Sequence, residues 1–121
     1  MTKHVLLVDD SETVILFEKM LLRDMGVEIV TAKNGKLALQ QIAAQRPDLV
    51  LLDMIRPDMD GMETLRRLKE TPETKTIPVV VVTTKGDPEQ VDQALAAGCD
   101  EYITKPVDKV ELLAKVKRLL A

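Results

Sequence analysis

The sequence predicts an α/β fold, a doubly wound (βα)5 arrangement in which five parallel strands alternate with five helices. Short runs of Val, Leu and Ile recur along the chain, and each precedes a segment with apolar residues three and four positions apart. Gly, Pro and Asn mark many of the boundaries between these two patterns. Connections this short require right-handed crossovers, so helices should cover both faces of one parallel sheet.

The first half of the chain contains two predicted strand–helix units. Residues 5–8 form an apolar strand, and Asp10 or Ser11 can cap the helix that follows, which Gly26 ends. That helix has apolar residues at helical spacing at Val14, Phe17, Met20 and Leu21. Residues 27–31 form a second strand, and the next helix ends before a proline. Its predicted inward residues are Leu37, Ala38, Ile42 and Ala43.

The second half contains three more units. The predicted strands are 49–52, 78–82 and 101–104. Asp60 can cap the third helix, Pro88 has the position of a first helical residue in the fourth, and Gly98 ends the fourth. The apolar residues of these two helices are Met62, Leu65 and Leu68, then Val91, Ala94 and Leu95. A last helix is expected over residues 107–121.

The polarity of the strands predicts their order. The first, third and fourth strands are apolar throughout, as expected of strands buried on both faces. The second strand carries Glu28 and the fifth is also more polar, so both suit sheet edges. We therefore expect the order 2-1-3-4-5, which is the flavodoxin-like arrangement.

Length and composition set limits on the protein's class. With 121 residues, 45% hydrophobic and 31% charged, the chain is expected to form one domain over residues 1–121. A net charge of -3 argues against a broad basic face for nucleic acid. A single cysteine, Cys99, excludes an intrachain disulfide. No signal peptide or apolar run long enough to span a membrane is evident, so a cytoplasmic protein is expected.

Polar residues gather where the predicted strands end. Asp9 and Asp10 follow the first strand, Asp53 follows the third, Thr83 and Thr84 follow the fourth, and Lys105 follows the fifth. Because parallel strands end at the same edge of a sheet, these side chains should share one crevice. Helix capping explains any one of them about as well.

Capping does not explain the set. Two carboxylates about 5 Å apart repel by about 3 kcal/mol at an effective dielectric constant near 20, and one lysine cannot neutralise three acids. A divalent cation would, and ligands that are all oxygen favour a hard ion such as Mg²⁺. Mg²⁺ also keeps positions open for water or a phosphoryl oxygen, so the pattern indicates phosphate chemistry.

Over its whole length the chain resembles a known family, the receiver domain of two-component response regulators, of the single-domain kind found in chemotaxis. The motifs that carry the resemblance are VDD at 8–10, LD at 52–53, PDMDG at 57–61, VT at 82–83 and AGCDEYITKP at 97–106. Each motif alone is weak, but all of them in this order and spacing are specific.

The resemblance implies a role for each matching residue. Asp53 would be the phosphorylated nucleophile, and Asp9 and Asp10 would hold Mg²⁺ with help from Asp53 and the backbone carbonyl of Ile55. Thr83 would be the switch hydroxyl, Tyr102 the switch aromatic and Lys105 the phosphoryl-binding lysine, with a cis peptide bond between Lys105 and Pro106. These implied roles agree with chemistry in which an ionised carboxylate attacks phosphorus beside neutralising cations.

The implied function is regulatory. The domain would accept a phosphoryl group from a sensor histidine kinase or phosphotransfer protein, taking part in its own phosphorylation and slow dephosphorylation without being an enzyme for other substrates. It would signal to an effector protein or domain through its fourth helix, fifth strand and fifth helix. Because no effector segment follows residue 121, either a stand-alone regulator or a fragment is expected.

Four residues beside the site depart from the family pattern or adjust it. Arg56 lies where the family usually has an apolar residue, and Thr84 is larger than usual and could narrow access. Ile55 and Lys85 occupy positions that tune dephosphorylation in the family. An apolar Ile55 cannot orient an attacking water, which favours a longer-lived phosphoryl group.

Alternatives remain open at several points. A phosphorylation-independent interaction module would keep the fold but usually loses pocket residues, and a haloacid-dehalogenase-type phosphatase would need an Asp-x-Asp motif that Asp9-Asp10 lacks. His4 is expected to be structural because it starts the first strand, far from the crevice. The last helix has two apolar stripes, which indicate either a wide buried face or a surface for a partner or a homodimer.

Overall fold

The structure is a computed structural model that describes residues 2–54, 61–84 and 88–121. Its elements in chain order are β1 (His4–Val8), α1 (Glu12–Leu22), the 3-10 turn η1 (Arg23–Met25), β2 (Glu28–Ala32), α2 (Gly35–Ala44), β3 (Leu49–Asp53), α3 (Gly61–Glu70), β4 (Val79–Thr84), α4 (Pro88–Ala96), β5 (Glu101–Lys105) and α5 (Lys109–Leu120). All strands pair in parallel, in the order β2-β1-β3-β4-β5. The predicted fold and strand order are therefore confirmed.

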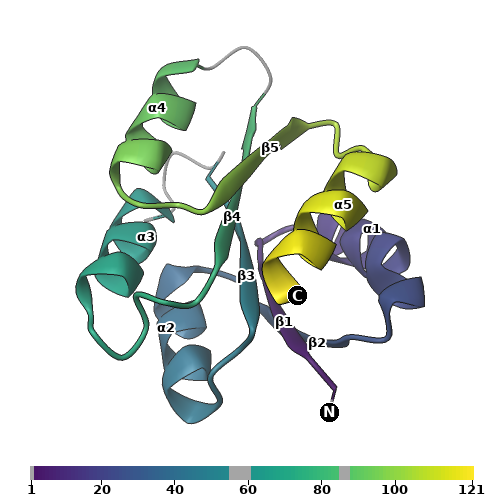
Figure 1. Ribbon diagram of the computed structural model, residues 1–121, viewed down its shortest axis with the longest axis horizontal. Coiled ribbons are helices and arrows are strands. Elements are labelled where there is room, and N and C mark those ends of the chain that lie inside the picture. Colours follow the sequence, from purple (N-terminus) through teal and green to yellow (C-terminus); the bar gives the residue numbers. More distant parts are fainter. Residues whose placement is uncertain (1, 55–60, 85–87) are drawn as a thin grey trace.

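Helices cover both faces of the sheet (Figure 1). α2, α3 and α4 lie on one face, and α1 and α5 lie on the other. Two apolar clusters fill the two interfaces, and the residues of each strand alternate between them. In β1, for example, Leu6 and Val8 face α2–α4, whereas Val5 and Leu7 face α1 and α5. This alternation explains why the central strands are apolar at every position.

Short polar side chains fix where the helices begin. The Val14 N–H donates to Ser11 Oγ at 3.3 Å, so Ser11 and not Asp10 caps α1. Asn34 caps α2 and Asp108 caps α5 in the same way. Asp60, the predicted cap of α3, lies outside the described residues.

The inward faces of the first two helices differ from the prediction. In α1, Phe17 and Met20 are exposed, while Leu22 and the carboxylic side chain of Glu18 are buried. Exposed and buried residues of α1 both recur at helical spacing. Spacing alone therefore did not show which side of the helix faces the core. In α2 the predicted Ala38 and Ile42 are buried, but Leu37 and Ala43 are exposed.

The boundaries of two strands matter for the site. β3 extends one residue beyond the prediction, so that Asp53 is its last residue. β4 extends to Thr84, which places Thr83 inside the ladder opposite Thr104 of β5. At the opposite end of the sheet, His4 begins β1 and its Nε2 lies 3.0 Å from Glu28, away from these strand ends.

Other sequence predictions have simple outcomes. Cys99 is buried, and burial raises the pKa of its thiol to about 11. In α5, Leu112 and Val116 face the core, while Val110 is 76% exposed. Among the described residues, no helix combines the length and apolar character that crossing a bilayer requires.

Lys69, near the end of α3, connects three elements. Its Nζ donates to the carbonyls of Lys75 at 3.1 Å and Ile77 at 2.8 Å, and to Asp100 Oδ2 at 2.7 Å. The same Asp100 oxygen accepts the Val79 N–H at 2.8 Å, at the start of β4. One largely buried ammonium therefore fixes the ends of α3, β4 and β5 relative to one another.

We expect Lys69→Met to lower the free energy of unfolding by about 2 to 4 kcal/mol, because the Asp100 carboxylate loses its cation and two carbonyls lose the ammonium that donates to them. Urea unfolding followed by circular dichroism measures this loss. Arg66→Met, an exposed change on the same helix, is the control and should stay within about 0.5 kcal/mol of wild type. Equal effects of the two substitutions would show that Lys69 does not have this role.

Candidate functional site

Residues from four neighbouring strands meet at the carboxyl edge of the sheet. Asp9 follows β1, Asp53 is the last residue of β3, and Lys105 is the last residue of β5. Thr83 in β4 lies one residue beyond Val82, which pairs with Asp53. The sheet register thus places four of the residues that were predicted to share one crevice at the same edge, namely Asp9, Asp53, Thr83 and Lys105.

The geometry is that of a buried acidic pair with one cation. Lys105 Nζ donates to Asp53 Oδ2 at 3.1 Å and lies 3.9 Å from Asp9 Oδ2. Both carboxylates are almost fully buried, at 4% exposure for Asp9 and 3% for Asp53. Asp9 Oδ1 accepts the Ser11 N–H at 2.9 Å. Its other oxygen is buried and accepts no hydrogen bond from the described residues.

This environment changes the acidity of Asp9. Burial and the adjacent Asp53 carboxyl raise the pKa of Asp9 to about 7, although the Ser11 N–H and Lys105 act in the opposite direction. The site therefore disfavours the charged form of Asp9 when no further cation is present. A cation that binds there would replace the proton.

The donor set fits Mg²⁺, although it is not a complete cage. In residues 2–54, 61–84 and 88–121, no group of three or more His, Cys, Asp or Glu side chains is arranged to hold a metal ion. Mg²⁺ does not require one, because it keeps several waters and uses one or two carboxylates. The buried Asp9 oxygen without a hydrogen-bond donor is a suitable ligand. The predicted carbonyl ligand of Ile55 lies outside the described residues.

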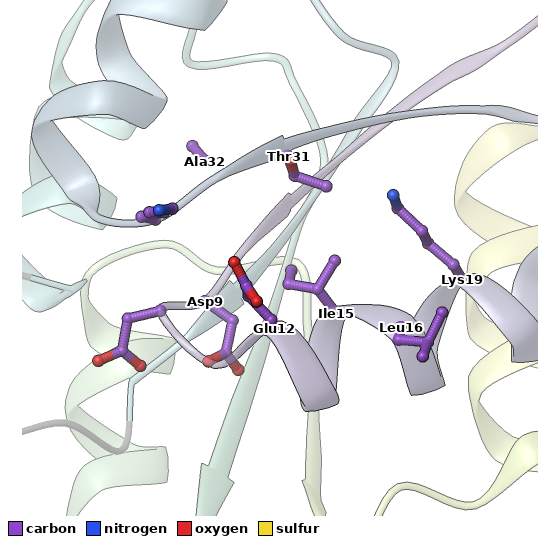
Figure 2. A pocket seen from close by; sticks show the side chains of 9 residues that line it. Asp9, Glu12, Ile15, Leu16, Lys19, Thr31 and Ala32 are labelled. Atoms are coloured by element: carbon purple, nitrogen blue, oxygen red, sulfur yellow. The ribbon is translucent and has the colours of Figure 1, made fainter.

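A hollow of about 390 Å³ borders Asp9 on the side of α1 and β2. It lies between the start of α1 and the end of β2, and its lining includes Asp9 and Glu12 at one end and Lys19 at the other (Figure 2). Asp10 also lines this hollow. Asp10 is half-buried, and its role as a second carboxylate of the metal site stays a prediction.

The two predicted switch residues face the same side of the sheet. Thr83 is fully buried, and its hydroxyl makes no hydrogen bond to any described residue. Val81 and Val79 of the same strand face α2–α4, so alternation places Thr83 on that face. Tyr102, half-buried on β5, packs against the same cluster and pairs with Val81.

The remaining predicted residues divide into two groups. The Lys105–Pro106 peptide bond is cis, as the resemblance implied. Ile55, Arg56 and Lys85 lie outside the described residues, and the side chain of Thr84 is likewise not described.

Two residues near the site were not anticipated from the sequence. Gln90 of α4 donates from Nε2 to the carbonyl of Met54 at 2.8 Å, which connects α4 to the residue after Asp53. Gly61 begins α3 so close to β3 that a Cβ would lie 2.8 Å from Met54 Sδ and 3.3 Å from the Asp53 carbonyl. The glycine in the PDMDG motif was a signal for this close approach.

Glu18 is a third buried acid, behind the pair. It lies on the inner face of α1 at 2% exposure. Burial, with added repulsion from Asp9 and Asp53, raises its pKa to about 8, although Lys105 lowers it. The spacing of Val14, Glu18 and Leu22 at four-residue intervals was the sequence signal for its burial.

We expect Glu18→Gln to remove part of the pH dependence of stability. Below pH about 4.5 Glu18 is protonated in both folded and unfolded chains, whereas between 4.5 and about 8 only the folded chain keeps the proton. In this pH range ionisation of Glu18 stabilises the unfolded chain. The free energy of unfolding of wild type therefore falls as pH rises, by at most about 1.4 kcal/mol per pH unit. Urea unfolding at pH 5 to 8 should show the variant gaining on wild type. If the free energies of unfolding of wild type and Glu18→Gln changed with pH in the same way, Glu18 would not be a buried, protonated residue in the folded chain.

Comparison with known proteins assigns the family. A model of the response regulator receiver domain matches residues 5–117. Response regulator PleD of Caulobacter vibrioides is 38% identical over 98% of this chain, which spans 26% of PleD, and Protein PilH of Pseudomonas aeruginosa is 34% identical over 98% of both chains. The solved chemotaxis response regulator CheY4 of Vibrio cholerae is 30% identical, with a TM-score of 0.88 over 99% of this chain and 100% of CheY4. The chain belongs to the family of response regulator receiver domains.

Proposed function

We propose that this receiver domain accepts a phosphoryl group on Asp53 from a sensor histidine kinase or phosphotransfer protein. The observation that carries the proposal is the contact of Lys105 Nζ with Asp53 at 3.1 Å, beside a second buried carboxylate. A carboxylate in this position has a cation to guide an incoming phosphate. It also ends a strand at the carboxyl edge of the sheet, where α/β proteins of this kind bind their ligands.

The chemistry assigned to the pocket is a phosphoryl transfer. An oxygen of Asp53 attacks phosphorus, and the new O–P bond forms as the N–P bond to the donor's imidazole breaks and that nitrogen keeps the electron pair. Lys105 holds one phosphoryl oxygen and reduces charge repulsion as the groups approach. Asp9, Asp10, Asp53 and the Ile55 carbonyl would hold Mg²⁺, which when bound neutralises charge on the phosphoryl oxygens.

Phosphorylation would then act on the two switch residues. It adds negative charge and acceptor oxygens next to Thr83, whose hydroxyl is buried without a described partner. Donation from Thr83 to the phosphoryl group would change the space that Tyr102 occupies on the same face. A local charge change would thus alter the shape of the surface around β5.

The output surface proposed for this change is α4-β5-α5. Leu95 on α4 is 47% exposed and Val110 on α5 is well exposed, so apolar contact area is available to an effector protein or domain, or to a second copy in a homodimer. The net charge of -3 gives no support for direct nucleic-acid binding. We assign residues 1–121 to one cytoplasmic receiver domain without membrane insertion.

The role is that of a regulatory phosphoacceptor, not of an enzyme with a separate substrate. Ile55, Arg56, Thr84 and Lys85, together with Pro106, are proposed to flank the site and to set the lifetime of the phosphoryl group. A phosphorylation-independent interaction module is not favoured, because both acids after β1, the threonine and the lysine are all present.

Incubation with acetyl phosphate and Mg²⁺ should add one phosphoryl group to wild type and none to Asp53→Asn, because the amide oxygen is a poor nucleophile. Intact-protein mass spectrometry measures the addition. Asp24→Asn, an exposed change beyond α1, is the control and should behave as wild type. Equal phosphorylation of wild type and Asp53→Asn would exclude Asp53 as the acceptor.

Millimolar Mg²⁺ should raise the melting temperature of wild type, since it binds only the folded arrangement of carboxylates. At ten times the dissociation constant the gain is about 1.4 kcal/mol, or about 5 °C for a domain of this size. Differential scanning fluorimetry with an added dye measures the shift. Asp9→Asn should melt higher than wild type without Mg²⁺ and respond much less to it. A Mg²⁺ shift that this variant retains in full would place the ion elsewhere.

A further inference from the structure

Lys115 of α5 contacts Tyr102 at both its backbone and its ring. Its Nζ donates to the Tyr102 carbonyl at 2.6 Å. The same nitrogen lies 5.1 Å from the centroid of the Tyr102 ring, within the range of a cation–π interaction. Since β5 is an edge strand, a side chain from α5 can pass its open side and reach a ring that packs on the α4 face.

The ammonium of Lys115 is itself held in place. It lies 3.1 Å from Glu111, four residues earlier on α5, and 3.3 Å from Glu101, the neighbour of Tyr102 in β5. Glu101 is fixed in turn by Arg118 at 2.6 Å. A lysine with two carboxylates, a carbonyl and a ring around it has far less freedom than an ordinary surface lysine.

We propose that Lys115 is a positioning residue that holds the Tyr102 ring in the orientation of this structure, so that α5 sets how readily Tyr102 switches. The link from Tyr102 to phosphorylation rests on the proposed function, whereas the restraint of the ring does not. Loss of an interaction of this type changes the ratio of two orientations by roughly two- to fivefold.

The composition of the chain provides a direct probe. It has one tyrosine and no tryptophan, so intrinsic tyrosine fluorescence reports on Tyr102 alone. Lys115→Met keeps most of the side-chain length and removes the charge. We expect this variant to have a different emission intensity and a higher acrylamide quenching constant than wild type, because the ring is no longer restrained. Acrylamide is uncharged, so the lost charge does not itself change its access.

Three further variants separate positioning from a general loss of structure. Lys115→Arg retains a cation over the ring and should restore the wild-type quenching constant, while Glu111→Gln should give an intermediate value. Lys117→Met, an exposed change on the same helix, should match wild type. Quenching is measured well below the melting temperature of each variant. A quenching constant for Lys115→Met equal to that of wild type, or no rescue by arginine, would overturn the proposal.

The second measurement tests the coupling to the pocket. Acetyl phosphate with Mg²⁺ should change Tyr102 fluorescence in wild type, and the change should shrink by half or more in Lys115→Met, since its ring already samples the other orientation. An unchanged amplitude would refute the coupling. If wild type is not phosphorylated at all, the proposed function fails, but the quenching comparison still decides whether Lys115 restrains the ring.

Discussion

The ion pair between Lys105 and Asp53 joins the last residues of two strands that are not adjacent in the sheet, and the rest of the site is arranged around it. One ammonium faces two nearly buried carboxylates, and it is 0.8 Å closer to Asp53 than to Asp9, from 3.9 Å less 3.1 Å. Burial and the adjacent Asp53 carboxyl raise the pKa of Asp9 to about 7, and the more distant Lys105 offsets this rise only in part. The parallel register determines where these strands end. The two carboxylates therefore lie close together in spite of the free energy that their burial and mutual repulsion cost.

The electrostatic conflict extends into the α1 interface. Glu18 is buried behind the pair, and its pKa rises mainly because burial disfavours a charge there. A neutral Glu18 spares the pocket a third negative charge. A bound cation in front of Asp9 would weaken the repulsion that Glu18 feels from Asp9 and Asp53. Metal binding at the edge would therefore be linked to proton binding at Glu18 through charge alone, without a conformational change between the two sites.

The sequence was sufficient for the fold and for the position of the pocket residues, because both follow from where apolar runs stop. Asp9, Asp53 and Lys105 each end or follow a run, and a parallel sheet brings such ends together. It was insufficient for α1, where exposed Phe17 and Met20 have the spacing of core residues while Glu18 occupies the core. Periodicity identifies a stripe of apolar residues along a helix but not whether that stripe faces the core or solvent. The contact of Gln90 with Met54 could not be predicted for a different reason, because it depends on how segments far apart in the sequence pack together.

β5 provides the physical connection between the pocket and the outer surface. This strand of five residues ends in Lys105, which contacts Asp53, and also contains Tyr102 and Glu101, which contact Lys115 of α5. A shift of Lys105 towards a new negative charge on Asp53 would move the same backbone that carries the Tyr102 carbonyl. Because Lys115 binds that carbonyl and lies over the ring, such a shift would change the contacts between α5 and β5. The converse also holds: a partner that engages the carboxylates around Lys115 would change the restraint on Tyr102 and, through β5, the position of the lysine in the pocket.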